Sequence, residues 1–179
     1  GWKVGRINPP LDGTLGANRL SGPIFADSVV DAAAYEVPEM PVFLGGFAAA
    51  EAEILLHVAP GFAGAVPTDD ASTIAILDDV RLGIEIASSP YPGINADGPT
   101  VTVSDFGNNA GLVRGAALAG WQMLDLCAIP VRAEIDGIDG ELLRLRGRMT
   151  RAQLQLVSFC SSDKADDFTR FLQQRSGDW

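Results

Sequence analysis

Apolar and polar side chains alternate along several short stretches of this chain, a pattern typical of β-strands that bury one face. This alternation, together with short apolar runs, predicts strands over 2–7, 51–58, 80–87, 100–103, 122–126 and 131–135. The last of these strands is expected to turn over 136–140, where aspartate and glycine are frequent, into a further strand over 141–145. The pattern therefore predicts a protein with many strands.

One helix interrupts these strands. It is expected to begin at Thr68-Asp69-Asp70, whose side-chain oxygens suit the free N–H groups of a first helical turn, and to end near Asp79. Apolar residues between these points recur at helical spacing. Segments rich in glycine, proline or asparagine are predicted as loops over 11–22 (with one helical turn), 59–67, 88–99 and 105–111.

Three glutamates lie on these apolar strands. Glu51 and Glu53 are two residues apart, so in a strand both side chains project from the same face. Glu85 has isoleucine on either side in the strand after the helix. A buried charge is costly unless it is compensated, and carboxylates are the ligands that Mg²⁺ or Mn²⁺ prefers. The spacing therefore indicates a divalent-metal site, and the alternative is that the glutamates face water on half-exposed strands.

His57 shares the strand parity of Glu51 and Glu53. It is either a hydrogen-bond partner of a metal-binding carboxylate or a neutral histidine at the end of the strand.

Composition and charge exclude some classes of partner. The chain has 179 residues, 47% of them hydrophobic, and a formal net charge of −10. We therefore expect a globular protein that binds neither nucleic acid nor an anionic membrane surface. No apolar run is long enough for a membrane span. The two cysteines have no metal-type spacing, which favours a reducing, cytoplasmic location.

Several motifs together resemble the fumarylacetoacetate hydrolase superfamily, in its branch of 2-keto-4-pentenoate hydratases and 4-oxalocrotonate decarboxylases. The matching stretches, in the family's order and covering roughly residues 1–140, are Gly-Trp-Lys-Val-Gly at 1–5, Gly-Pro-Ile-Phe-Ala-Asp at 22–27, Glu-Ala-Glu-Ile at 51–54, Ile-Glu-Ile-Ala-Ser-Ser at 84–89, and Asp-Phe-Gly-Asn-Asn-Ala-Gly at 105–111. The resemblance implies an α+β fold, namely a mixed, mainly antiparallel β-roll with peripheral helices.

The resemblance also implies site residues. It assigns Glu51, Glu53 and Glu85 to the metal, and Ser88 and Asn109 to substrate binding. The remaining assignments place Lys3 in the active site and make Asp27 the nearest substitute for an acid that hydratase-type relatives carry before the glycine equivalent to Gly22. From the residues alone, Lys3 is expected to be an exposed strand lysine and Asp27 a turn cap, and the alternative for Asn108-Asn109 is a turn in the left-handed region.

Two positions depart from the hydratase pattern. Leu20 and Ser21 stand where relatives have the acid, and Gly111 stands where they often have a serine. The activity that the resemblance implies is a Mg²⁺- or Mn²⁺-dependent lyase that hydrates or decarboxylates a short 2-keto acid through an enolate. Carbon–carbon bond hydrolysis is the alternative chemistry. Homo-oligomers are expected by analogy with the family.

The C-terminal part of the chain departs further from the family. Residues 142–179 lack its pattern, so we expect a core over 1–141 and a diverged or frame-displaced tail over 142–179 in the same domain. The chain also begins at Gly1, where relatives carry a preceding helical segment. A hypothesis of a different class follows from these features: the chain is an inactive fragment of such an enzyme.

Overall fold

The structure is a computed structural model that describes residues 1–35, 37–129, 131, 134–135 and 138–139. The described chain divides into two compact units. Unit 1 comprises Gly1–Leu55 and Arg81–Ala116, and unit 2 comprises Leu56–Val80 and the described residues from Ala117 onward. The expected tail over 142–179 lies outside the described residues, as does the predicted strand over 141–145. No helix of the described part is long and apolar enough to cross a membrane.

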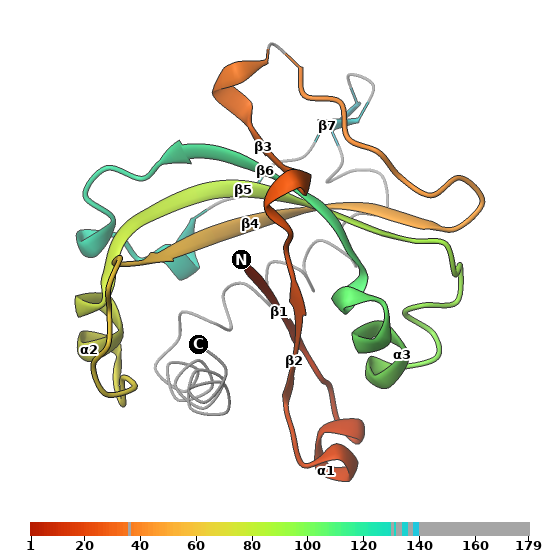
Figure 1. Cartoon of the computed structure of the whole chain (residues 1–179), viewed down its shortest axis with the longest axis horizontal. Coiled ribbons are helices and arrows are strands. Elements are labelled where there is room, and N and C mark those ends of the chain that lie inside the picture. Colours follow the sequence, from red (N-terminus) through yellow and green to blue (C-terminus); the bar gives the residue numbers. More distant parts are fainter. Residues whose placement is uncertain (36, 130, 132–133, 136–137, 140–179) are drawn as a thin grey trace. The chain divides into compact units, whose positions relative to one another are not determined.

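In the part of the chain that the structure describes, strands predominate over helices, and the helices are short (Figure 1). The strands are β1 Trp2–Arg6, β2 Arg19–Pro23, β3 Val29–Asp31, β4 Phe47–Val58, β5 Leu77–Ser89, β6 Asn109–Ala117, β7 Glu134–Ile135 and β8 Ile138–Asp139. The α-helices are α1 Leu11–Leu15, α2 Asp70–Ala75 and α3 Pro99–Ser104, and the 3-10 helices are η1 Ala26–Ser28, η2 Ala32–Ala34, η3 Phe106–Asn108, η4 Trp121–Met123 and η5 Leu126–Ala128.

Unit 1 begins with an antiparallel pair, β1 and β2, in which Lys3 lies opposite Gly22. The expected strand at 2–7 is confirmed, and so is the helical turn in the following loop, which is α1. The loop predicted over 11–22 was wrong from Arg19 onward, because β2 begins there and pairs with β1. A strand rich in glycine and proline is stabilised by this partner, which local composition does not reveal.

A sheet with the order β3-β6-β5-β4 carries the remaining long strands. The predicted strands at 51–58 and 80–87 are confirmed within β4 and β5, which are both longer than expected. In Figure 1, β4 and β6 run in one direction and β5 runs in the other. The short β3 is parallel to β6, so the sheet is mixed.

An ion pair adds to the contact between β3 and β6. The Arg114 Nε and Nη2 donate to the two carboxylate oxygens of Asp31 at 2.5 and 2.6 Å. This hydrogen bonding lowers the pKa of Asp31 below its usual value.

The segment 99–104 was predicted to include a strand over 100–103 and is instead the helix α3. Pro99 occupies the first helical turn, where a missing N–H costs nothing, and Gly98 precedes it at φ 93°. The Thr102 hydroxyl donates to the carbonyls of Gly98 and Ile94, each at 3.1 Å. These local bonds outweigh the strand preference of the alternating threonines and valines.

Unit 2 contains the predicted helix, which is shorter than expected because β5 already begins at Leu77. Its start is confirmed. Asp69 caps α2 by accepting from the Ser72 backbone N–H at 2.7 Å, while the Ser72 side chain binds the Asp69 N–H in return. The strand predicted over 122–126 was wrong, since η4 and η5 occupy this region.

Within the predicted strand at 131–135 the structure describes β7, which pairs antiparallel with β8; the expected partner strand over 141–145 lies outside the described residues.

The buried side chains of unit 1 include polar groups beside the apolar ones. Its buried apolar residues are Ile7, Ala87, Ile94, Leu112 and Val113, and its buried polar residues are Glu85, Ser88, Ser89 and Asn108. Three of the polar residues belong to the second half of β5. Because a buried polar group needs a partner, this half of β5 is where a site is to be sought.

The start of β4 depends on a glycine that meets the end of β5. A Cβ atom at Gly46 would lie 2.0 Å from the Ser89 carbonyl oxygen, which is backbone and has no room to move. We expect Gly46→Ala to lower the free energy of unfolding by about 1–3 kcal/mol, the usual cost of overpacking. Urea denaturation would measure this.

Gly13→Ala is the matched control, because nothing lies within 4 Å of its Cβ position and alanine favours the α1 helix. Equal stabilities of the two variants would contradict the packing assigned to Gly46.

Candidate metal centre

Three carboxylates converge in unit 1, two from β4 and one from β5. Ligand atoms of Glu51, Glu53 and Glu85 all lie within 4.8 Å of one another. Alternation along β4 places the first two on one face. Gly83 on β5 lets β4 come close, because a Cβ atom there would lie 2.9 Å from the Leu55 side chain. The structure thus brings together all three glutamates that the sequence singles out.

Burial makes these carboxylates hard to ionise together. Glu85 is only 2% exposed, and Glu51 and Glu53 are half-buried. Burial, followed by the charges of Glu85 and Glu51, raises the pKa of Glu53 to about 8. Burial also raises the pKa of Glu85, against the opposing effect of the Lys3 charge. Without a cation, the cluster therefore holds a proton at neutral pH.

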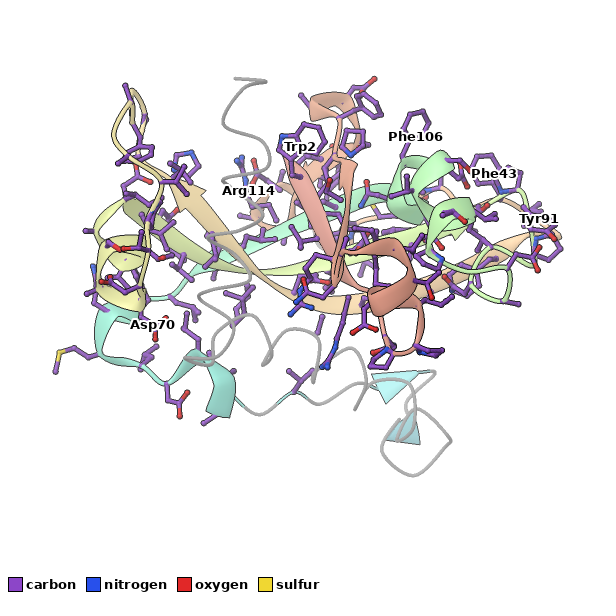
Figure 2. All side chains as sticks on the ribbon, turned by 90° about the horizontal axis from the view of Figure 1, so that it is seen from below. Trp2, Phe43, Asp70, Tyr91, Phe106 and Arg114 are labelled. Atoms are coloured by element: carbon purple, nitrogen blue, oxygen red, sulfur yellow. The ribbon has the colours of Figure 1, made fainter. Side chains whose placement is uncertain are left out.

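Lys3 supplies the cation nearest to Glu85. Its Nζ lies 2.9 Å from Glu85 Oε1, and its side chain is only 12% exposed. In β1 the side chains of Trp2 and Val4 take the opposite face from Lys3. Figure 2 shows Trp2 on the side of unit 1 that points away from β4 and β5. Lys3 is therefore an inward-facing, paired lysine rather than an exposed one.

Asn109, the first residue of β6, binds the same oxygen. Its Nδ2 donates to Glu85 Oε1 at 2.8 Å and to the Gly111 carbonyl at 3.3 Å. Among the described residues, no hydrogen bond is made to the other oxygen, Oε2. The two donors thus fix the carboxylate through one oxygen and leave the second available to a ligand. Asn109 was expected to bind substrate, and here it contacts Glu85.

The turn before Asn109 has an unusual backbone. Phe106, Gly107 and Asn108 all have positive φ, at 52°, 69° and 65°. Asn108 is 3% exposed; its Nδ2 donates to Asn95 Oδ1 at 3.2 Å, and its own Oδ1 has no partner among the residues that the structure describes. Such strain and unmet hydrogen bonding are typical of segments held in place for function. The predicted polar, glycine-bearing loop includes this turn.

Two other predicted residues lie in different surroundings. Ser88 is buried, and its Oγ accepts from the Phe43 N–H at 3.0 Å and donates to the Phe47 carbonyl at 2.7 Å. It therefore holds the segment before β4 against β5, and substrate binding by Ser88 stays a prediction. Asp27 is exposed in η1, and within the described residues no hydrogen bond or ion pair joins it to the cluster. Its role as an acid also stays a prediction.

His57 is placed in unit 2, where it pairs with Asp78. Both side chains are largely exposed. The partner of the histidine in the structure is therefore Asp78, and not one of the three clustered glutamates.

The cluster has the donor chemistry of a hard divalent cation. Carboxylate oxygens are the ligands of Mg²⁺, Mn²⁺ and Ca²⁺. Close, buried carboxylates are costly to ionise together until a cation or protons neutralise them: burial first, and then the charges of Glu85 and Glu51, raise the pKa of Glu53. The residues Glu51, Glu53 and Glu85 therefore fit a divalent metal.

The pKa of Glu53 generates a prediction for the metal-free protein. An acid whose pKa is raised from 4.5 to about 8 by folding binds its proton more tightly in the folded state between these values. In EDTA, the melting temperature should therefore fall as the pH rises from about 4.5 to 8. Glu53→Gln should flatten this dependence, and Glu39→Gln, which changes an exposed glutamate, should retain it. Parallel curves for Glu53→Gln and the parent would contradict the assignment.

No protein-family model and no curated protein sequence matches the chain. Solved structures do match. One is 4-oxalocrotonate decarboxylase from Pseudomonas putida G7 complexed with magnesium and adipate, with a TM-score of 0.60 and 20% identity. Another is the same enzyme complexed with calcium and acetate, with a TM-score of 0.55 and 19% identity.

Each match covers 98% of this chain and 61% of the neighbour, so the chain spans about three fifths of the length of these structures. The expected α+β fold class is confirmed: this chain has the fold of the 4-oxalocrotonate decarboxylase structures.

Proposed function

We propose that the protein is a divalent-metal-dependent lyase that acts on a short 2-keto acid. The observation that carries this proposal is the convergence of Glu51, Glu53 and Glu85 beside the inward-facing Lys3. Mg²⁺ or Mn²⁺ is the proposed cofactor. A cation held at this position supplies Lewis-acid chemistry, in which it polarises the keto group and stabilises negative charge on its oxygen.

The fold neighbours support the same class of ligand. Their crystals hold a divalent cation together with a carboxylate compound, adipate in one case and acetate in the other. A 2-keto acid presents a carboxylate and a neighbouring keto oxygen, which together suit a cation that is bound from one side only. We therefore propose 4-oxalocrotonate and shorter 2-keto acids as the first substrates to test.

Each residue of the site has a proposed task. Glu51 and Glu53 would hold the cation from β4 and Glu85 from β5, where Lys3 and Asn109 already engage Glu85 Oε1. Lys3 Nζ carries a proton within reach of the site, so it is the group proposed to deliver a proton to the substrate carbon or to orient the substrate carboxylate. The burial of these groups limits water and strengthens their electrostatic effect.

Decarboxylation is the proposed reaction in preference to hydration. Hydration needs groups that activate or deliver water, and position 111, where hydratases often carry serine, is a glycine with little free space. A Cβ atom at Gly111 would lie 2.7 Å from Met40 Cε and 3.1 Å from the Ser28 carbonyl oxygen. Neither Leu20 nor Ser21 offers a carboxylate. When the carbon–carbon bond to the distal carboxylate of 4-oxalocrotonate breaks, CO₂ leaves and the electron pair passes through the double bond to the keto oxygen, so this reaction needs stabilisation of that oxygen's charge and a proton returned to carbon.

Metal binding is the first test of this proposal. We expect Mn²⁺ to bind with a stoichiometry of about one, and Glu51→Gln, Glu53→Gln and Glu85→Gln each to weaken the affinity by at least about tenfold, since each removes a charged ligand. Isothermal titration calorimetry would measure it, with Glu39→Gln as an exposed control. Unchanged affinity in all three variants would rule out this centre.

Turnover tests the chemistry separately. With Mg²⁺ at saturation, Lys3→Met should reduce the decarboxylation rate of 4-oxalocrotonate by about 10²-fold or more, the usual contribution of a positioned proton-transfer group. Lys3→Arg keeps the charge but not the readily transferred proton, so it separates the two roles. Release of CO₂ would be followed together with loss of substrate absorbance.

If the parent binds Mn²⁺ but turns over none of these acids, the chain is an inactive relative. Formation of a hydrated product without CO₂ would instead identify a hydratase.

A further inference from the structure

We propose that Gly22 is a positioning residue, whose missing side chain lets β2 settle on the turn 106–108 and so brings Lys3 and Asn109 to the same oxygen of Glu85. This inference rests on the proposed metal centre. It adds to that centre a residue that touches neither the metal nor the substrate.

The contact at Gly22 is between backbone atoms. A Cβ atom there would lie 1.9 Å from the Phe106 carbonyl oxygen, 2.3 Å from its carbon and 2.7 Å from the Gly107 nitrogen. Backbone atoms cannot rotate away as a side chain can, so even a methyl group would force the two segments apart. Every residue other than glycine is therefore excluded at this position while the contact is kept.

A displacement of β2 at Gly22 would move the residues that contact Glu85. It lies opposite Lys3 in the antiparallel pairing of β1 and β2. On the other side of the contact, Phe106 is three residues before Asn109 in a continuous turn. Gly22 therefore joins the two segments that carry the two donors to Glu85 Oε1, at 2.9 Å and 2.8 Å. A shift of about 1 Å is enough to break either hydrogen bond.

The turn itself is held rigidly against β2. Its positive φ angles at Phe106 and Asn108 are unfavourable for residues with side chains, so surrounding contacts must maintain them. One support is the Asn108–Asn95 hydrogen bond. Another is the Phe106 ring, labelled in Figure 2, which meets the Phe25 ring edge to face at 5.4 Å between centroids. Phe25 follows closely after β2, so this contact ties the turn to the same segment as Gly22 does.

The experiment compares Gly22→Ala with Gly5→Ala. Gly5 is on β1, two residues from Lys3, and a Cβ atom there would lie 3.2 Å from Leu20 Cδ1, the end of a flexible side chain. We expect Gly22→Ala to weaken Mn²⁺ binding by about tenfold or more, as loss of an orienting partner does, and Gly5→Ala to change it by less than about twofold. Circular dichroism and melting curves would verify that each variant is folded.

A double-mutant cycle distinguishes positioning from general damage. In a Lys3→Met/Asn109→Ala background the donors that Gly22 positions are gone, so Gly22→Ala should have little further effect on Mn²⁺ affinity. The same loss in both backgrounds would overturn the inference while leaving the metal centre intact. Absence of Mn²⁺ binding in the parent protein would overturn the proposed function, and this inference with it.

A second variant covers the case in which Gly22→Ala does not fold. Asn95→Ala removes the hydrogen bond between Asn95 and Asn108, which also supports the turn, and it introduces no clash. It should weaken Mn²⁺ binding several-fold in the parent and have no further effect in the Lys3→Met/Asn109→Ala background. Unchanged affinity for Asn95→Ala in the parent would overturn the inference.

Discussion

The burial of Glu85 is the constraint on which the rest of unit 1 depends. A carboxylate that is 2% exposed is tolerated only when its charge is matched and its oxygens are hydrogen-bonded. Lys3 and Asn109 meet that need from β1 and β6, two segments far apart in the chain. Both bind the same oxygen, Oε1, so they compensate the charge without engaging the second oxygen of the carboxylate. The contacts that stabilise this buried charge are therefore also the ones that shape the proposed metal centre.

Glycines allow the strands and turns of unit 1 to approach one another more closely than residues with side chains would permit. Gly83 admits the Leu55 side chain of β4, Gly46 admits the Ser89 carbonyl, and Gly22 admits the backbone of the turn before β6. Glycine is entropically costly within a strand, and its use at such contacts is justified by what the close approach brings together. A chain with 20 glycines thus uses several of them to fit three separate segments around one buried carboxylate.

Much of the site was predictable from local pattern, and its long-range contacts were not. Strand alternation places Glu51 and Glu53 together and turns Lys3 away from Trp2, and both features hold in the structure. The pairing of Lys3 with Glu85 depends on how β1 lies against β5, which no local rule supplies. The helix at 99–104 was missed because its alternating β-branched residues suggest a strand, whereas Gly98 and Pro99 set the backbone. Resemblance to a known family provided the remaining assignments.

The charge balance of the cluster connects this geometry to its proposed use. Three carboxylates beside one lysine leave an excess of negative charge when all are ionised. The protein can remove that excess in two ways: Glu53 takes up a proton, as its pKa of about 8 indicates, or a divalent cation replaces the proton. If the cluster served stability alone, an apolar residue in place of Glu53 would avoid the free-energy cost of burying an ionisable carboxyl group beside two others.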